Sequence, residues 1–573
     1  MYFLINDCKL IIIKMKKIDP DIFYFMLLLL IVLILKYPVM SLPYYWDDMN
    51  YVISTVDYIY HNAFTPFLWE YSFGHPPFFF LFVGALFKIF GNSNLIAHFS
   101  VAFFSFLTLF FTYLIGKTLS DRKVGMMASL MLFFAPIFFS YSGLFLLDIP
   151  LTALTTMTIY FAIKSKPFLY FLFASLTILT KIPGVIVVGG VILSKMIKEK
   201  RINKNVIIYA LPILTFIFLL FLNELHYGKF LYPAGVSMLN LNIVKNAFNL
   251  LIILKTILFD QYRWILTSIF ILSVINLKFI KNKKKTYFIP HLSLTVILFL
   301  FLYNLPLLTN YLIDYFPNIE YYFYLVRSFS LLFSILFLFI LLFYKNIVPV
   351  IAMIKAPELT FTSLLMILFY IFIIPFSPRY ILPIFPILFI FFSSSLVSLF
   401  KRYSYLALVA MIIIFSINLS GDRSTVGFTL ETNMEYVDAI KTQISGAEYI
   451  EENFPNSTVL ASFPLSSELK YPYSGYVKKP INVVTYPHFL GLTGHEKNYT
   501  IFLHPQFNQN QTIDLNSIDF YYYTPQEFSS VIPDIAKKLN LTLIKRFESN
   551  NKSVEIYRVN KNIKYPIYSF DNF

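Results

Sequence analysis

The residues able to do chemistry gather in a few short stretches of this sequence. Two adjacent carboxylates, Asp47 and Asp48, follow the first long apolar run, and a third, Asp148, directly precedes a later one. A carboxylate at a membrane surface can accept a proton, orient a reacting group or bind a metal ion. The alternatives are a solvated loop for the adjacent pair and a helix N-cap for Asp148.

Two cations complete this set of residues. Lys181 and Arg379 each lie in a Pro-containing turn beside an apolar run. The topology described below places both on the outer side of a membrane, where positive charge is less common than on the cytoplasmic side. They therefore predict contact with an anion, such as the phosphate group of a lipid-linked substrate. The alternative for each is a side chain that extends to the bulk lipid headgroups.

Membrane-spanning helices are the elements expected to position these residues. Of the 573 residues, 58% are hydrophobic and 13% are charged, which excludes a string of soluble domains and a disordered chain. The single cysteine, Cys8, excludes a disulfide scaffold. Apolar runs of suitable length predict about thirteen spans. They cover residues 22–39, 95–115, 124–141, 149–163, 168–180, 182–193, 206–222, 256–277, 288–308, 328–344, 359–376, 381–400 and 405–419.

Charges beside these runs predict the orientation in the membrane. Basic residues before the first run place the N-terminus in the cytoplasm, and an odd number of spans places the C-terminus outside. The stretch 76–90 is interpreted as an interfacial or re-entrant helix, because counting it as a span would move the basic segment 278–285 to the outside. The remaining basic clusters then fall on the cytoplasmic side, at residues 122–123, 164–166, 195–204 and 401–402. The sequence thus predicts a multi-pass protein of the cell membrane.

The chain is expected to divide into two domains. Residues 1–420 form a transmembrane domain with a first outer loop at 41–94, and residues 421–573 form a soluble extracytoplasmic α/β domain, because their composition changes to mixed charges and short alternating runs. The elements predicted in the second domain are strands at 457–463 and 541–547 and a polar helix at 526–539. Its aromatic run at 520–523 could line a binding surface, but is expected to fill the core.

The net charge follows the same division. Residues 421–573 hold 14 basic and 16 acidic side chains, a net charge of −2, so the net charge of +15 for the whole chain leaves +17 on residues 1–420. The basic excess therefore belongs to the cytoplasmic loops of a membrane protein. We expect membrane lipids around the chain and no nucleic-acid partner.

Four short motifs, taken in order, resemble those of the integral-membrane GT-C glycosyltransferases. They are Asp47-Asp48 after the first span, His75-Pro76-Pro77, Asp148-Ile149-Pro150 and Leu179-Thr180-Lys181. The sequence looks most like the dolichyl-phosphate-mannose protein mannosyltransferases and the related bacterial aminoarabinose transferases of lipid A. This resemblance covers residues 43–197, and more loosely Arg379-Tyr380. It implies a mainly α fold, a polytopic transmembrane helical bundle of GT-C type with a C-terminal extracytoplasmic α/β domain.

The resemblance also implies roles for individual residues. Asp47 matches the family's general base, which removes the proton of the acceptor hydroxyl, and Asp48 would orient it or contact the acceptor. Asp148 would assist at the acceptor or at a metal ion. The residues implied in binding the donor or its lipid phosphate are His75, Lys181 and Arg379.

Metal dependence stays open at this point. Aminoarabinose transferases carry a metal-binding glutamate just before the residue that matches His75, and this chain has Gly74 there. The cofactor is therefore unknown. A divalent metal ion is one candidate, with Asp48, Glu70 and His75 as its possible ligands.

The resemblance implies an enzyme, a glycosyltransferase dependent on a polyprenyl-phosphate sugar. The donor would be a sugar linked to polyprenyl (dolichyl) phosphate, and the acceptor on the outer face would be a protein, a glycan or a lipid. With one base and no second carboxylate placed as a nucleophile, we expect direct displacement with inversion. Two alternatives are a secondary transporter, which would carry ionisable residues near mid-span in two related halves, and a noncatalytic scaffold with an external binding domain.

Overall fold

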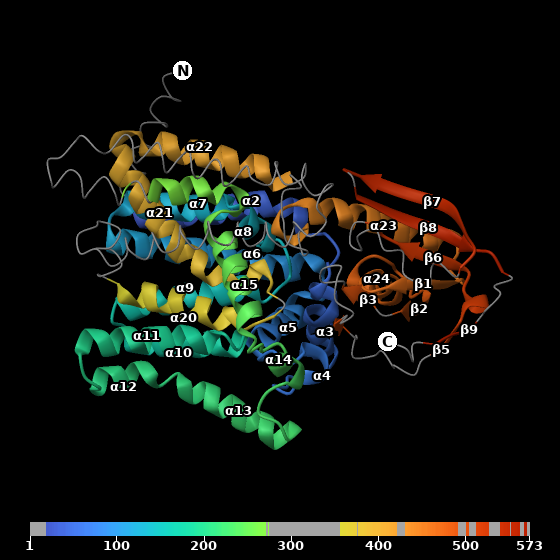
Figure 1. Cartoon of the computed structure of the whole chain (residues 1–573), viewed down its shortest axis with the longest axis horizontal. Helices are drawn as coiled ribbons and strands as arrows, with labels where there is room; N and C mark the ends of the chain where they lie inside the picture. Colours follow the sequence, from blue (N-terminus) through green and yellow to red (C-terminus); the bar gives the residue numbers. More distant parts are fainter. Residues whose placement is uncertain are drawn as a thin grey trace, which may run out of the picture.

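The computed structural model describes most of the chain in two parts, a helical bundle and a smaller domain with a β-sheet (Figure 1). The described residues are 19–270, 273, 356–374, 376–420, 430–486, 488–490, 500–502, 512–525, 539–550, 552–561 and 567–569. The predicted spans at 288–308 and 328–344 lie outside these residues, as does most of 271–277 at the end of another predicted span.

Apolar helices make up the first part. They are α2 (Pro20–Lys36), α6 (Asn94–Leu119), α7 (Arg122–Phe134), α8 (Pro136–Tyr141), α9 (Asp148–Ile163), α10 (Pro167–Thr180), α11 (Gly184–Glu199), α12 (Lys204–Ala210), α13 (Ile213–Tyr227), α15 (Ile243–Leu258), α20 (Pro357–Ile371), α21 (Phe385–Phe400) and α22 (Ser404–Ile417). Helix breaks follow the prolines: Pro136 divides the predicted span 124–141, and Pro212 stands between α12 and α13. The predicted start of the span 256–277 is wrong, because α15 ends at Leu258 and the chain turns at Gln261, whose φ is +53°.

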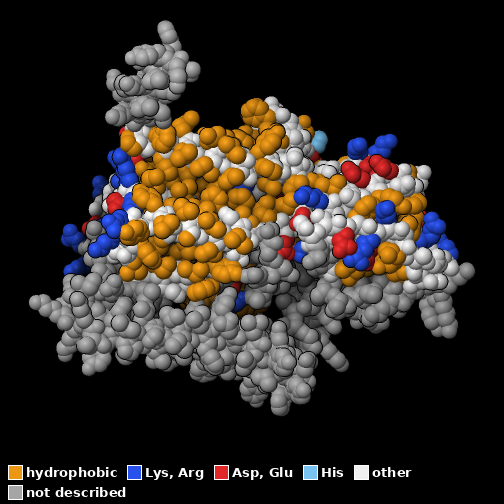
Figure 2. Space-filling view, turned by 90° about the horizontal axis from the view of Figure 1, so that it is seen from above, with side chains coloured by type: hydrophobic (Ala, Val, Ile, Leu, Met, Phe, Trp, Pro, Cys, Tyr) orange, Lys and Arg blue, Asp and Glu red, His pale blue; other side chains and the backbone are white. Residues whose placement is uncertain are grey.

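Four helical stretches of the described chain are long and apolar enough to cross a membrane, which identifies a membrane protein. They are Pro20–Val39, Asn94–Leu119, Lys204–Tyr227 and Pro378–Ile417. The last comprises two helices, as the sequence predicts, because Lys401 with φ +45° ends α21 before α22 begins. Figure 2 shows hydrophobic side chains over one face of the bundle, with Lys and Arg gathered at the end away from the sheet domain.

The first outer segment folds over one end of the bundle. After α2 come a short 3-10 turn, η1 (Tyr37–Val39), a π-helical turn, η2 (Asp48–Val52), and the helices α3 (Ile53–His61), α4 (Trp69–Ser72) and α5 (Phe78–Phe90). Helix α5 forms where an interfacial helix is predicted, and its 13 residues are too few for an ordinary span. It packs closely on α3, because a Cβ atom at Gly84 would lie 2.5 Å from Ile59.

The second part is an α/β domain that packs against this outer segment. Its main sheet has the strand order β2-β1-β6-β8-β7, parallel from β2 (Asn482–Tyr486) through β1 (Thr458–Ser462) to β6 (Phe520–Tyr523) and antiparallel from β6 through β8 (Lys552–Val559) to β7 (Leu541–Ser549). Short strand pairs join β3 (His488–Leu490) to β4 (Thr500–Phe502) and β5 (Thr512–Asp514) to β9 (Ile567–Ser569). Among the described residues of this domain, helices form at α23 (Glu435–Asn453), which covers β7 and β8, and at α24 (Leu465–Lys470).

Two sequence predictions for this domain are confirmed. Strands form at both predicted places, as β1 and β7, and the four aromatic residues of β6 are buried in the core. The predicted polar helix at 526–539 lies outside the described residues except for its last one. Hydrogen bonds join the two parts: the amide of Tyr44 donates to the carbonyl of Ser474 at 3.1 Å, and the Tyr476 hydroxyl donates to the carbonyl of Tyr44 at 3.0 Å.

Two neighbouring glycines of α11 provide a test of helix packing in the bundle. A Cβ atom at Gly190 would lie 2.5 Å from the Cα of Thr362 in α20, whereas one at Gly189 would meet only the Leu365 side chain, at 3.7 Å. We expect Gly190→Ala to destabilise the protein by about 1–3 kcal/mol, because the backbones of the two helices must separate. Gly189→Ala should leave stability unchanged or raise it by up to about 1 kcal/mol. Thermal unfolding in detergent measures both, and equal melting temperatures would contradict the expected helix contact.

Candidate functional site

Arg379 lies at the centre of a buried cluster of charges. It is the second residue of a 3-10 turn, η5 (Pro378–Ile384), which leads into α21. Its guanidinium Nη2 forms a close ion pair with Asp47 Oδ2, its Nε faces Asp148 Oδ2 at 3.7 Å, and its Nη1 lies 3.5 Å from Glu431 Oε2. Residues from four separate segments of the chain thus meet at one guanidinium group.

Lys181 extends this cluster on the side of Asp148. Its Nζ donates to Asp148 Oδ1 at 2.7 Å and lies 4.9 Å from the centre of the Tyr380 ring. The side chains of Lys181 and Asp148 are 8% and 1% exposed, so the pair is removed from solvent. A buried charge is tolerated only beside a compensating one, and here each partner supplies it.

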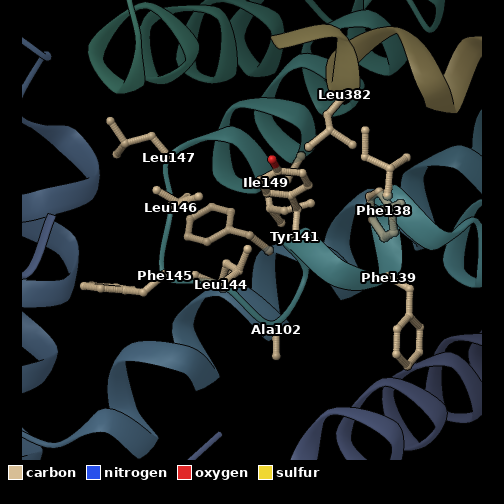
Figure 3. Packing of buried hydrophobic residues seen from close by; sticks show 14 of the residues in the cluster. Ala102, Phe138, Phe139, Tyr141, Leu144, Phe145, Leu146, Leu147, Ile149 and Leu382 are labelled. Carbon is tan, nitrogen blue, oxygen red and sulfur yellow. The ribbon is translucent and has the colours of Figure 1, made fainter. Parts of the chain in front are cut away.

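Helix ends bring these residues together. Asp148 begins α9, but no side-chain capping hydrogen bond is made there, so the N-cap alternative from the sequence is wrong. Lys181 directly follows α10, in an extended conformation that precedes the turn into α11. The segment between α8 and α9, which fixes the start of α9, is held by buried apolar side chains such as Phe145 and Leu147 (Figure 3).

Asp47 is the most exposed carboxylate of the cluster. Its side chain is 27% exposed, against 1% for Asp148 and 11% for Glu431. It stands just before η2, where the chain turns at Trp46 with φ +49°. The Trp46 ring packs edge-on against Phe463 of the sheet domain, with centroids 5.6 Å apart. The sheet domain therefore helps to hold Asp47 in a partly exposed position.

Asp48 lies away from its neighbour's ion pairs. It is fully buried, and its Oδ2 accepts a hydrogen bond from the Phe145 amide at 2.9 Å, while no hydrogen bond to Oδ1 is seen from the described residues. Burial, together with the charges of Glu431 and Asp47, raises the pKa of Asp48 well above its usual value. Asp48 thus links the first outer segment to the α8–α9 segment rather than joining the group around Arg379.

His75 lies beside the cluster, not within its ion pairs. Its ring packs on Tyr51 with centroids 4.9 Å apart. Burial and the charges of Lys181 and Arg379 hold the pKa of His75 below its usual value, so its imidazole is neutral at physiological pH. His75 also lines a small pocket between the first outer segment and α13; its other lining residues are Pro66, Trp69, Gly74, Pro76, Pro77, Ile182, Phe216, Leu219, Leu220, Asn223, Leu231 and Tyr232.

The candidate metal ligands do not form a metal site. Across the part of the chain that is described, no group of three His, Cys, Asp or Glu side chains could hold a metal ion. Glu70 is exposed on α4, whereas Asp48 is buried against Phe145. Position 74 has no room for a ligand either: Gly74 has φ +75°, and a Cβ atom there would lie 2.1 Å from the Cβ of Tyr232. We therefore derive no chemical step through a metal ion.

Two residues of the cluster are missing from the sequence prediction, Glu431 and Tyr141. Glu431 lies in a short 3-10 turn, η8 (Leu430–Thr432), that leads into the sheet domain, and its Oε2 accepts a hydrogen bond from the Tyr141 hydroxyl at 2.9 Å. An acidic residue in a polar segment normally indicates solvent exposure, and Tyr141 ends an apolar run like any other aromatic residue. The sequence therefore held no signal for this contact.

Comparison with known proteins adds a family resemblance. Residues 74–227 match the sequence profile of the family described as dolichyl-phosphate-mannose-protein mannosyltransferase. This match confirms the resemblance to that branch of the GT-C glycosyltransferases for the segment that carries His75, Asp148 and Lys181. No curated protein sequence matches the chain.

Several solved structures show a distant likeness. ArnT from Cupriavidus metallidurans matches with 12% identity and a TM-score of 0.46 when bound to undecaprenyl phosphate, covering 93% of this chain and 98% of that one. In the apo state it matches with 10% identity and a TM-score of 0.48, covering 94% and 98%. The oligosaccharyltransferase of Archaeoglobus fulgidus, in complex with Zn and sulfate, matches with 12% identity and a TM-score of 0.41, covering 76% and 60%. At such TM-scores these likenesses establish no shared fold.

The Lys181–Asp148 pair can be tested by a double-mutant cycle. Asp148→Asn removes the carboxylate that Lys181 contacts, whereas Lys181→Met leaves Asp148 facing Arg379. We expect Asp148→Asn to cost about 3 kcal/mol or more and Lys181→Met to cost less. The double variant should unfold at a higher temperature than Asp148→Asn alone. Additive losses in detergent-based thermal unfolding would show that the two charges do not compensate each other.

The buried carboxyl of Asp48 predicts a pH-dependent stability. Because folding raises its pKa, the folded state binds more protons than the unfolded state, and stability falls as pH rises above the ordinary value near 4. Asp48→Asn imitates the neutral form and should raise the melting temperature at pH 8, with a smaller gain at pH 5. An effect of Asp48→Asn that is equal at pH 5 and pH 8 would mean that Asp48 is already ionised in the folded protein across this range.

Proposed function

We propose that this chain is an integral-membrane glycosyltransferase that transfers a sugar from a polyprenyl-phosphate donor to a protein, glycan or lipid acceptor. The observation that carries the proposal is the direct contact between Asp47, a partly exposed carboxylate, and the buried guanidinium of Arg379. A group that can accept a proton thus stands beside a group that can bind an anion. The match of residues 74–227 to the mannosyltransferase family supports this class of reaction.

In the proposed reaction Asp47 is the general base. It takes the proton of the acceptor hydroxyl as that oxygen attacks the anomeric carbon, and the bond between this carbon and the donor phosphate breaks. The electron pair goes to the phosphate oxygen, so negative charge grows on the leaving group. Lys181 and Arg379 would stabilise this charge, and they are already oriented by their carboxylate partners. Neutral His75 would donate a hydrogen bond to the donor.

Direct displacement with inversion fits the positions of the carboxylates. A retaining mechanism requires a second carboxylate that can reach the anomeric carbon as a nucleophile. Asp148 is 1% exposed and bound to Lys181, and Asp48 is buried against the Phe145 amide, so neither is free for that role.

The proposed topology places this chemistry on the outer face. It comprises about thirteen spans, a cytoplasmic N-terminus and an extracytoplasmic C-terminal domain. Two predicted cytoplasmic basic clusters lie side by side, since Lys123 Nζ contacts the Lys401 carbonyl at 2.8 Å. Figure 2 shows Lys and Arg gathered at the end of the bundle away from the sheet domain, and this end would face the cytoplasm. Arg379 and Asp47 lie at the opposite end, beside that domain.

Replacing the base tests the proposed reaction. In membranes supplied with radiolabelled polyprenyl-phosphate sugars, Asp47→Asn should lower the rate of transfer about 10²–10⁴-fold, because the acceptor hydroxyl loses its proton acceptor. Asp57→Asn is the matched control: its carboxylate lies in the same outer segment, where it accepts a hydrogen bond from Asn92, and transfer should stay at the wild-type rate. The proposal fails if Asp47→Asn transfers sugar as fast as the wild type.

A further inference from the structure

Glu431 holds one edge of Arg379 and has no role in the reaction described above. A single oxygen, Oε2, accepts the Tyr141 hydroxyl at 2.9 Å and faces Arg379 Nη1 at 3.5 Å. The main chain around Glu431 is fixed: the Ser140 hydroxyl lies 2.6 Å from the carbonyl oxygens of both Glu431 and Asn433, and Gln261 donates to the carbonyl of Thr432 at 2.6 Å. This carboxylate is therefore held at Arg379 by the start of the sheet domain.

The cluster contains more negative than positive groups. Three carboxylates, those of Asp47, Asp148 and Glu431, face the two cations Lys181 and Arg379. A phosphate entering this group would add further negative charge in surroundings that water reaches poorly, where repulsion between like charges is strong. One carboxylate must therefore withdraw from Arg379 or become neutral before an anion can bind there.

Glu431 is the carboxylate best placed to give way. Asp148 is held by Lys181 at 2.7 Å, and Asp47 is in close contact with Nη2. The contact of Glu431 with Nη1 is longer than an ordinary charge-assisted hydrogen bond. The Nε of Arg379 makes no hydrogen bond to any described residue, so this guanidinium keeps hydrogen-bonding capacity that an incoming anion can use.

We propose that Glu431 is a positioning residue that occupies the Nη1 edge of Arg379 in the ligand-free protein and yields this edge to the donor phosphate. The inference rests on the proposed function, since the phosphate is that of the polyprenyl donor. The glutamate keeps Arg379 extended toward Asp47 and Asp148 while the site is empty. On neutralisation it can stay beside Tyr141 without opposing the incoming anion.

The surroundings of Glu431 allow this neutralisation near physiological pH. Burial raises the pKa of Glu431 to about 6, with the negative charges of Asp47 and Asp148 acting in the same direction and Arg379 and the Tyr141 hydroxyl acting against it. These four groups and the buried Asp48 are the titratable groups that act on it from the first outer segment, α8, α9 and η5. Below pH 6 the glutamate is mostly neutral, and above pH 6 it is mostly ionised and competes for Arg379.

Binding of a singly charged lipid across a pH series tests the proposal. The probe is undecaprenyl methyl phosphate, a diester whose single charge does not change between pH 5 and pH 8, added to the purified full-length protein in detergent. For the wild type, Kd should fall about tenfold from pH 8 to pH 5, as expected when one opposing charge is removed. For Glu431→Gln, Kd should already be low at pH 8 and vary little with pH.

Glu435→Gln provides the matched control. Glu435 is also a buried glutamate at the start of the sheet domain, but its carboxylate pairs with Lys552 at 2.7 Å instead of Arg379. This variant should keep the pH dependence of the wild type. The proposal is overturned if Glu431→Gln and the wild type show the same change of Kd with pH, or if Kd rises as the pH is lowered.

Tyr141→Phe gives a second test that retains Glu431, should Glu431→Gln not fold. Loss of the hydroxyl removes a hydrogen bond that favours the ionised glutamate, so the midpoint of the pH dependence should move upward. An unchanged midpoint would contradict the proposal. Because the readout is binding, it is independent of catalysis: a wild type that binds as expected but transfers no sugar would refute the glycosyltransferase and leave the role of Glu431 intact.

Discussion

The guanidinium group of Arg379 is the constraint on which the outer end of this protein depends. A buried positive charge must be compensated, and three carboxylates from distant parts of the chain supply the compensation: Asp47 from the first outer segment, Asp148 from α9 and Glu431 from the start of the sheet domain. The bundle and the sheet domain are thereby joined by charge as well as by packing. A substitution at any of these positions acts on both parts.

In the proposed reaction, the same constraint would prepare the site before substrate arrives. Side chains that must stabilise developing charge work best when they need no rearrangement, and ion pairs in a water-poor setting keep them in place. Lys181 is oriented by Asp148, and Arg379 by Asp47. The contact of Glu431 with Nη1 is longer than an ordinary charge-assisted hydrogen bond, and Nε makes no hydrogen bond to any described residue. Asp47 and Asp148 thus hold the two cations in place, whereas Glu431 is the carboxylate that can exchange its partner.

Much of this arrangement follows from the sequence, because polar residues beside apolar runs must gather at the membrane surface. Order and topology predicted that Asp47, Asp148, Lys181 and Arg379 belong together, and the structure places them in contact. The direction of an individual side chain was not predictable: Asp48 follows Asp47 directly, yet it begins η2 and points to Phe145. Periodicity reports which face of an element is apolar, but not how a short irregular turn aims each residue.

Ion pairs between residues far apart in the sequence could not be predicted either. Lys195 was predicted among the cytoplasmic basic residues, but it is buried and binds Glu358 at 2.8 Å, a partner 163 residues away. Glu431 falls within the predicted soluble domain and was not singled out from the sequence. In both cases the local sequence shows that a residue is charged, but not whether its side chain is buried. Burial requires a second charge of opposite sign nearby, and only the fold determines where that charge lies.

The wall of the pocket beside His75 clarifies how the proposed reaction is divided among residues. A side chain at position 74 would have to displace Tyr232, whose Cβ lies within 2.1 Å of the place for a Cβ at Gly74, so the backbone there serves packing and contributes no ligand. The developing charge on the donor phosphate must then be met by groups on the other side of His75. Lys181 and Arg379 are the cations that act on His75, and the carboxylates around them set how much of their charge remains for the phosphate. In this protein the balance between two cations and three carboxylates therefore determines how strongly the site can hold an anion.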